Sequence, residues 1–317
     1  MRILLWHVHG SWTDAFVRGR HRYLLPVTPS RDADGLGRAG RPWPSTVDVP
    51  YDRLRELDVD VVLLQRPKEL QLAEDWLGRR PGTDVPAVYL EHNTPRGDVP
   101  NTRHHLADRA DIPLVHVTGF NRLLWDSGCA PDTVIEHGIP DPGPRYRGTL
   151  PRAAVAVNEP VRRWRVTGTD LIPRFVRAGV PVDVFGTGTA GLAARLGVAL
   201  GECGDQPPAA LHDALAQRRC YLHLCRWTSL GLALIEAMQL GLPVVALGST
   251  EAYEAVPASA GVVSTALDRL VGAARDLLAD EGMAAAMGAQ ARALALHRYG
   301  LPRFLSDWDR LLEELVR

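Results

Sequence analysis

Continuous apolar runs separated by helical patterns are the feature that most limits what this chain can fold into. Four such runs lie at 2–8 (RILLWHV), 59–65, 87–92 and 113–118. A continuous, mostly apolar run predicts a strand buried on both faces. The helical pattern KELQLAEDWLG follows the second run. Because strands of this kind alternate with helices, the sequence predicts an α/β fold with a parallel sheet covered by helices.

The same alternation begins again after a predicted linker. The segment 140–152 (PDPGPRYRGTLPR) has four prolines and two glycines in thirteen residues, which is typical of a domain boundary. We therefore expect two Rossmann-like domains, 1–142 and 143–300. In the second domain we expect strands at 153–158, 182–186, 220–224, 243–247 and 261–264, and helices at about 169–178, 208–218, 230–240 and 266–297.

Two other segments complete this plan. The stretch 28–47 is rich in Gly, Pro and Arg, and it predicts a long loop. After the break at Gly300-Leu301-Pro302, the segment 301–317 predicts an amphipathic helix. Its apolar stripe needs a surface to pack on, and it consists of Phe304, Trp308, Leu311, Leu312 and Leu315.

Composition and charge exclude several classes of protein. The formal net charge is -1, which argues against a general binder of nucleic acid or membrane surfaces. Lys68 is the only lysine, so a bound phosphate must be held by arginines or backbone N–H groups. No apolar segment reaches the length of a membrane span or signal sequence. The four cysteines lack zinc spacing and predict reduced thiols of a cytoplasmic protein, and the pairs His7/His9 and His104/His105 lack a suitably spaced carboxylate, so we expect no metal site.

The spacing of the dinucleotide fingerprint occurs at Gly186-x-Gly188-x-x-Gly191, between a predicted strand and a helix. The fingerprint normally opens the first βα unit of a domain, whereas this copy follows a second strand. The acidic partner should end the next strand, but Glu202 lies in a Gly-rich stretch. The position therefore favours a tight β-to-α turn over NAD binding.

The segment 226–247 (RWTSLGLALIEAMQLGLPVVAL) predicts a loop, a helix and a buried strand in quick succession. A helix that begins at 229–232 offers unpaired N–H groups to phosphate oxygens, and Gly231 lets a ligand approach the backbone closely. Glu236 is the one charge in an otherwise apolar helix. A carboxylate there can accept hydrogen bonds from the hydroxyl groups of a ribose docked at that end.

Several motifs in order resemble the retaining glycosyltransferases of the GT-B fold (glycosyl transferases group 1, family 4-like). Their signature has two glutamates separated by seven residues, and its second half is similar to 236–246 (EAMQLGLPVVA). The segment VIEHGIPD at 134–141 resembles the element that ends the first domain. The segment VTGTDLIPRF at 166–175 resembles the Lys-Gly-x-Asp-Leu element, and VYLEHN carries His92 at the place of a histidine beside the sugar.

This resemblance implies two parallel-sheet domains facing across a cleft, with the C-terminal helix 301–317 returning to the first domain. It also implies retaining, hexosyltransferase-type transfer from a nucleoside-diphosphate-sugar donor on the second domain. The acceptor is an unknown small molecule, glycan or lipid on the first domain. The donor is a co-substrate and no other cofactor is implied, because backbone amides and arginines stabilise the leaving diphosphate in place of a metal ion.

The sequence departs from the family pattern at two places. Thr228 occupies the position of the first glutamate, which contacts the transferred sugar in the family, and the lysine of the phosphate element is missing. We expect Arg163 and Arg165 to replace that lysine, since Arg can bind phosphate bidentately. Because Thr228 replaces the first glutamate, one alternative is that the chain is an inactive GT-B scaffold that partners an active transferase. The other alternative is a nucleotide-sugar epimerase.

The expected site residues follow from these motifs. The expected catalytic residues are His92, Thr228 and Glu236; the expected nucleotide-sugar-binding residues are Arg163, Arg165, Thr167, Ser229, Leu230, Gly231, Leu232 and Glu236; and the expected acceptor-side residues, which follow the first strand, are Gly10, Ser11 and Trp12.

Overall fold

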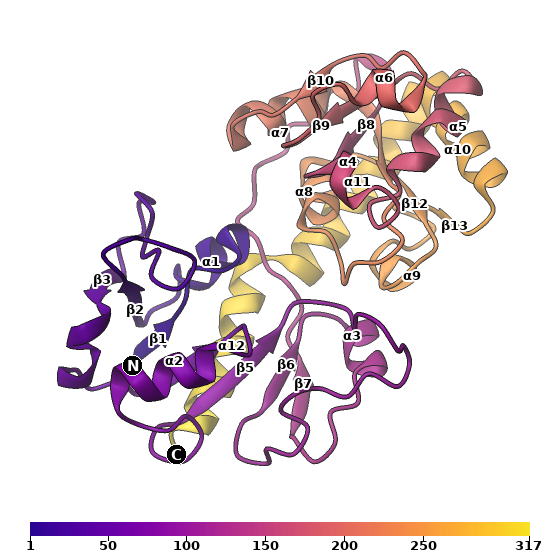
Figure 1. The fold of residues 1–317 in the computed structure, drawn as a ribbon. Coiled ribbons are helices and arrows are strands. Elements are labelled where there is room, and N and C mark those ends of the chain that lie inside the picture. Colours follow the sequence, from indigo (N-terminus) through magenta and orange to yellow (C-terminus); the bar gives the residue numbers. More distant parts are fainter. The chain divides into compact units, whose positions relative to one another are not determined.

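The computed structural model describes all 317 residues. It divides into two compact units, each with its own sheet (Figure 1). Unit 1 comprises Met1–Pro140 and Leu301–Arg317, and unit 2 comprises Asp141–Gly300. Unit 1 is thus built from two separate stretches of chain. No helix is both long enough and apolar enough to cross a bilayer.

The sheet of unit 1 has seven parallel strands in the order β3-β2-β1-β4-β5-β6-β7. The strands are β1 Arg2–Leu5, β2 Arg22–Val27, β3 Thr46–Pro50, β4 Val61–Leu64, β5 Ala87–Glu91, β6 Leu114–His116 and β7 Asp132–Val134. The helices are α1 Gly10–Phe16, η1 Tyr51–Glu56, α2 Glu69–Leu77, α3 Gly119–Leu124 and α12 Leu301–Leu315. The four predicted apolar runs are β1, β4, β5 and β6, whereas β2, β3 and β7 were not predicted.

The sheet of unit 2 has six parallel strands in the order β10-β9-β8-β11-β12-β13. The strands are β8 Leu150–Ala156, β9 Val182–Phe185, β10 Cys203–Gly204, β11 Arg218–His223, β12 Val244–Leu247 and β13 Gly261–Ser264. The helices are α4 Pro160–Arg163, η2 Thr169–Leu171, α5 Ile172–Arg177, α6 Leu192–Leu196, α7 Pro208–Gln217, α8 Leu232–Leu240, α9 Ala252–Ala255, α10 Leu267–Ala279 and α11 Glu281–Tyr299.

The prediction of one helix over 266–297 is wrong, because the chain breaks between α10 and α11. Asp280 lies at the break with extended backbone, and its side chain accepts a hydrogen bond from the Met283 N–H at 2.8 Å. A side-chain acceptor at this position satisfies an N–H group that has no partner within the helix. Asp280 therefore begins a new helix instead of continuing the old one.

The helix α12 packs in unit 1, where it runs beside the sheet in Figure 1. Phe304, Trp308 and Leu312 from the predicted stripe are buried in the same core cluster as Trp12 and Phe16. The Trp12 ring lies 5.7 Å from the Trp308 ring in an edge-to-face arrangement, centroid to centroid. Such pairs add to the stabilisation from apolar burial, so α12 is part of the core of unit 1.

Candidate functional site

In unit 2, two loops meet at the carboxyl ends of β8 and β11. The Arg226 N–H donates to the Val166 carbonyl at 2.8 Å. Gly168 has a φ of +69°, and a Cβ atom there would lie 1.8 Å from the Leu224 carbonyl oxygen. Only glycine allows this conformation at such close approach. The loop after β8 and the loop 224–231 after β11 are therefore fixed against each other.

Arg226 holds these loops together and was not foreseen from the sequence. Its guanidinium pairs with both carboxylate oxygens of Asp170, at 2.6 Å and 2.9 Å, and also donates to the Arg165 carbonyl at 3.0 Å. Bidentate pairs of this kind fix geometry as well as contributing energy. The acidic residue of the Gly-x-Asp element thus has a structural partner. Arg226 and Asp170 are far apart in sequence, so no local pattern could have revealed the pair.

The helix α8 begins later than expected. Its N-cap is Gly231, which offers no side-chain hydrogen bond to the helix, so the helix begins two residues after the start of the expected range 230–240. The N–H groups of Leu230, Gly231, Leu232 and Ala233 donate to no other backbone group. Thr228 is half-buried and Ser229 is buried in the loop before the helix. An uncapped helix N-terminus carries a partial positive charge suited to anions.

Glu236 lies on the one accessible face of α8. The buried residues of this helix are Leu234, Ile235 and 237–240, which leaves Leu232, Ala233 and Glu236 at the surface. Residues spaced by three or four positions share one face of a helix. The Glu236 side chain therefore lies on the same face as Leu232 and Ala233, whose N–H groups donate to no other backbone group. His212 on α7 is its neighbour, with Nε2 3.7 Å from Oε2, a contact that the sequence analysis missed.

The arginines before Thr167 differ in what they contact. Arg162 and Arg165 have side chains 72% and 73% exposed, beside Glu159 and Asp170 respectively. Arg163 is half-buried, and no carboxylate lies within ion-pair distance of its guanidinium. Burial raises the pKa of the Cys225 thiol to about 11 against the opposing effect of the Arg163 charge. Arg163 thus places an uncompensated positive charge next to the loop 224–231.

Thr167 has a role in the fold that differs from the one expected. Its side chain is 3% exposed. The hydroxyl lies 3.2 Å from the Trp164 carbonyl and 2.8 Å from the Thr169 hydroxyl. These bonds stabilise the turn before η2, so the structure gives Thr167 no surface for direct contact with a nucleotide sugar.

In unit 1, histidines gather at the carboxyl ends of the strands. His92 directly follows β5 and is 8% exposed, and its ring lies 4.1 Å from the His9 ring, centroid to centroid. Burial lowers the pKa of His92 well below 6.5, and His9 and His137 act in the same direction. Burial also lowers the pKa of His137 to about 4. At neutral pH these buried imidazoles are uncharged hydrogen-bonding groups.

The expected acceptor-side residues lie in the first turn of α1 and are not equivalent. Ser11 is exposed and Gly10 is half-buried, and a Cβ atom on Gly10 would lie 2.8 Å from Nη2 at the flexible end of the Arg41 side chain. Trp12 is 2% exposed and meets His92 edge to face at 5.4 Å. The expectation that Trp12 lines an acceptor surface is therefore wrong, since it is a core residue that supports His92.

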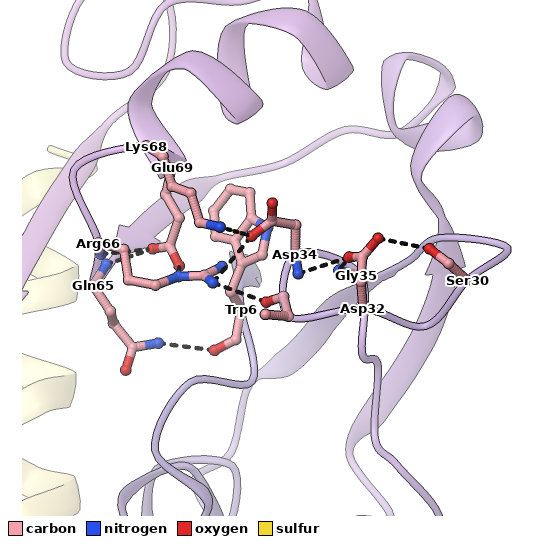
Figure 2. Close-up of polar contacts among 10 residues, drawn as sticks. Trp6, Ser30, Asp32, Asp34, Gly35, Gln65, Arg66, Lys68 and Glu69 are labelled. Atoms are coloured by element: carbon pink, nitrogen blue, oxygen red, sulfur yellow. Dashed lines mark hydrogen bonds and ion pairs between the residues drawn. The ribbon is translucent and has the colours of Figure 1, made fainter.

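A polar cluster joins the long loop after β2 to the turn between β4 and α2 (Figure 2). Glu69 is fully buried and accepts from the Gln65 N–H at 2.6 Å and from Arg66 Nε at 2.6 Å. Burial raises the pKa of Glu69 even though Arg66 opposes this. Arg66 also pairs with Asp34 at 3.0 Å, and Lys68 pairs with the same carboxylate. The only lysine of the chain is thus held by an acidic partner.

The glycines of the dinucleotide fingerprint have structural explanations. Gly188 and Gly191 both have a φ of +71°, and a Cβ atom on Gly186 would lie 2.2 Å from the Val157 carbonyl oxygen. These features belong to a tight turn between β9 and α6. Glu202 pairs with Arg218, so its carboxylate already has a partner within the protein.

The histidines do not form a metal site. His104 is paired with Glu91, with Nε2 3.4 Å from Oε2, and no cluster of three or more His, Cys, Asp or Glu side chains could hold a metal ion.

Comparison with known proteins identifies the architecture. Residues 193–294 match the family model of glycosyl transferases group 1. HepE from Anabaena, solved in complex with UDP, aligns at a TM-score of 0.72 and 16% identity over 99% of this chain and 100% of that chain. Sucrose-phosphate synthase from Thermosynechococcus elongatus aligns at a TM-score of 0.70 and 15% identity over 99% of each chain. The chain has the GT-B fold.

The GT-B assignment of this chain covers its full length, but not all of its relatives' length. TarM aligns at a TM-score of 0.61 and 14% identity, and this GT-B chain spans 54% of it. No curated protein sequence matches the chain. The matched family region contains Thr228 in the loop before α8, and Glu236 within α8. Arg163 and the residues of unit 1 lie outside it.

Proposed function

We propose that the chain is a retaining, metal-independent glycosyltransferase that moves a sugar from a nucleoside-diphosphate-sugar to an acceptor hydroxyl. The observation that carries this proposal is the start of α8, where N–H groups without a backbone partner are followed about one turn later by the partly exposed Glu236. The family match over 193–294 and the GT-B fold support it. The UDP bound by HepE makes UDP the first nucleotide to test.

Each group on unit 2 has a proposed role set by its chemistry. Glu236 accepts hydrogen bonds from the two ribose hydroxyls. The N–H groups at 230–233 and the Arg163 guanidinium bind the diphosphate, with exposed Arg165 as a second cation. Thr228 faces the transferred sugar through a short hydroxyl where the family has a longer carboxylate. In unit 1, His92 binds the sugar, and Gly10 and Ser11 contact the acceptor.

The reaction follows from where charge develops. The bond between the anomeric carbon and the diphosphate oxygen breaks, and the electron pair leaves with the diphosphate. The acceptor oxygen attacks on the same face, and the leaving phosphate oxygen takes the acceptor's proton. Fixed N–H groups and a guanidinium aimed at a developing anion typically lower such a barrier by several kcal/mol, about 3–4 kcal/mol per donor in measured cases.

The test is a binding panel followed by transfer assays. A ligand that binds only the folded state at a hundred times its Kd stabilises a protein by about 2.7 kcal/mol, so the correct nucleoside diphosphate will raise the Tm. The corresponding sugars are then assayed for transfer, with EDTA present. Binding followed by metal-free transfer supports the proposal. Binding without transfer, with transfer restored by Thr228→Glu, favours the inactive scaffold, and no nucleotide binding at all contradicts both.

A further inference from the structure

The carboxamide of Gln65 has only one orientation that fits its surroundings. Gln65 directly follows β4 and is 4% exposed. Its Nε2 lies 2.8 Å from the Trp6 carbonyl oxygen, and a carbonyl can only accept a hydrogen bond. The NH₂ end must therefore face Trp6, and in Figure 2 the amide oxygen points away from that bond.

This orientation determines which nitrogen of His92 carries the proton. The Gln65 Oε1 lies 2.9 Å from His92 Nε2. Because an amide oxygen only accepts, Nε2 must be the N–H, and in a neutral imidazole Nδ1 is then an acceptor. The titratable groups that face His92 are His9 and His137, and both disfavour its charged form. His9 in turn lies near Glu91 and Arg66, and His137 lies near Arg303.

We propose that Gln65 is a positioning residue that fixes His92 as the Nε2–H tautomer, so that any bond through Nδ1 is accepted from a donor group. The inference rests on the proposed function for its consequence. A sugar that meets His92 through Nδ1 must present a hydroxyl, and a carboxylate of a uronic acid has no proton to donate there.

The backbone of Gln65 is held in place by a hydrogen bond to Glu69. Its N–H donates to Glu69 at 2.6 Å, and Glu69 is fully buried and paired with Arg66. A side chain whose backbone is anchored in this way loses little freedom when it binds a neighbour. The turn after β4 thus holds Gln65 independently of His92.

The tautomer is measured directly by NMR of ¹⁵N-histidine-labelled protein at pH 7, with His92→Asn to assign the signal. Wild type is expected to show His92 as the Nε2–H form. Gln65→Leu removes the acceptor and shifts His92 toward a mixture of tautomers, whereas Gln65→Glu raises the pKa of His92 by placing a carboxylate beside Nε2–H. The control is Gln71→Leu, at an exposed residue of α2 bonded to Asp75, which should change nothing. A wild-type Nδ1–H form, or a pKa unchanged in Gln65→Glu, overturns the proposal.

An activity assay adds the second arm. Gln65→Leu is expected to lower kcat/KM for sugar transfer about tenfold, the size of one ordinary hydrogen bond, with UDP affinity unchanged. If no donor sugar is ever transferred, the proposed function fails while the tautomer measurement still decides the role of Gln65. If transfer occurs and Gln65→Leu leaves it unchanged, the positioning role is overturned.

Discussion

The two units carry different groups at the carboxyl ends of their strands: neutral imidazoles in unit 1, and a cation and backbone N–H groups in unit 2. Both sheets are entirely parallel. In unit 1 these strand ends carry buried histidines that are neutral at pH 7, His92 and His137. In unit 2 they carry the uncapped start of α8 and the unpaired Arg163. The fold therefore supplies a location, and the loop residues decide whether that location binds neutral hydroxyl groups or anions.

The difference between the units also reflects how burial affects imidazole and guanidinium groups. An imidazole can lose its charge when buried, so neutral histidines can be packed at 8% and 5% exposure. A guanidinium stays charged, and the Arg165 side chain remains 73% exposed. Neutral imidazoles can therefore be buried in unit 1 without a charged partner, whereas the buried Arg218 of unit 2 is paired with Asp183 at 2.7 Å.

The largest expected effect is a loss of stability confined to unit 1. Trp308→Ala removes a ring that is 1% exposed in the core of unit 1, and a change of this kind costs about 3–5 kcal/mol. Hydrogen exchange should show lost protection in β1–β7 with little change in β8–β13. Glu314→Ala, at an exposed position of the same helix, is the matched control. Equal loss in both sheets would contradict the division into units.

The second prediction is that the stabilities of the two units depend differently on pH. The folded pKa values of His116 and His137, about 4, lie below the ordinary histidine pKa of 6.5, so the unfolded state binds more protons between these two values. Stability from these groups is present above pH 6.5 and is lost as pH falls. At pH 5 each costs about 2 kcal/mol. Unit 2 has one such buried imidazole, His223, so unit 1 should weaken first in denaturation followed by hydrogen exchange.

A pair of variants checks the assignment of this pH effect. His137→Gln should reduce the pH dependence of unit 1, because the buried imidazole is gone. The exposed His297 serves as the control through His297→Gln. An unchanged pH profile in His137→Gln would show that other groups cause the acid sensitivity.

The third prediction concerns the anion-binding edge of unit 2. Arg163→Ala should weaken UDP by about 1.5–3 kcal/mol, the usual value of a hydrogen bond to a charged group, and should leave uridine unchanged. Calorimetric titration of both ligands measures this. Arg162→Ala is the control, since that side chain is 72% exposed beside Glu159. Equal losses for UDP and uridine would exclude Arg163 from phosphate binding.

The smallest effect is expected at Glu236. Glu236→Gln keeps the shape but removes the charge, and it should weaken uridine and UDP equally by about 1–2 kcal/mol because the ribose is common to both. His212 lies 3.7 Å from this carboxylate, so His212→Gln is a useful companion that changes the neighbour alone. Unchanged affinity in the Gln variant would remove Glu236 from the ribose site.

In unit 1 the sequence predicted the neighbouring strands β1, β4, β5 and β6 and missed β2, β3 and β7. β2 contains Pro26 and begins with exposed Arg22, β3 contains Asp48 and ends in Pro50, and β7 has only three residues. These strands lie toward or at the sheet edges, where full burial is not required. A continuous apolar run therefore identifies the centre of a parallel sheet better than its borders.

The candidate site was predictable where one residue is unusual in its own segment. Glu236 stands out as a charge in an apolar helix. Gln65, His212 and Arg226 were missed because each acts through a partner distant in sequence, as when Gln65 meets His92 27 positions later. Local patterns carry no information about such pairs. Conversely, Trp12 follows the first strand as an exposed residue could, and only packing against α12 shows that it is core.

The discontinuity of unit 1 has a consequence for biosynthesis. Trp12 is made before unit 2, whereas Trp308 and Phe304, which pack in the same core, are made after all of unit 2. Unit 2 is a continuous stretch that can fold as soon as it leaves the ribosome, since domains fold as units during synthesis. The sheet of unit 1 is made first, and the apolar face that α12 covers stays exposed while unit 2 is synthesised and folds. A nascent chain that stalls before Leu301 therefore exposes the aromatic core of its own N-terminal half to chaperones and proteases.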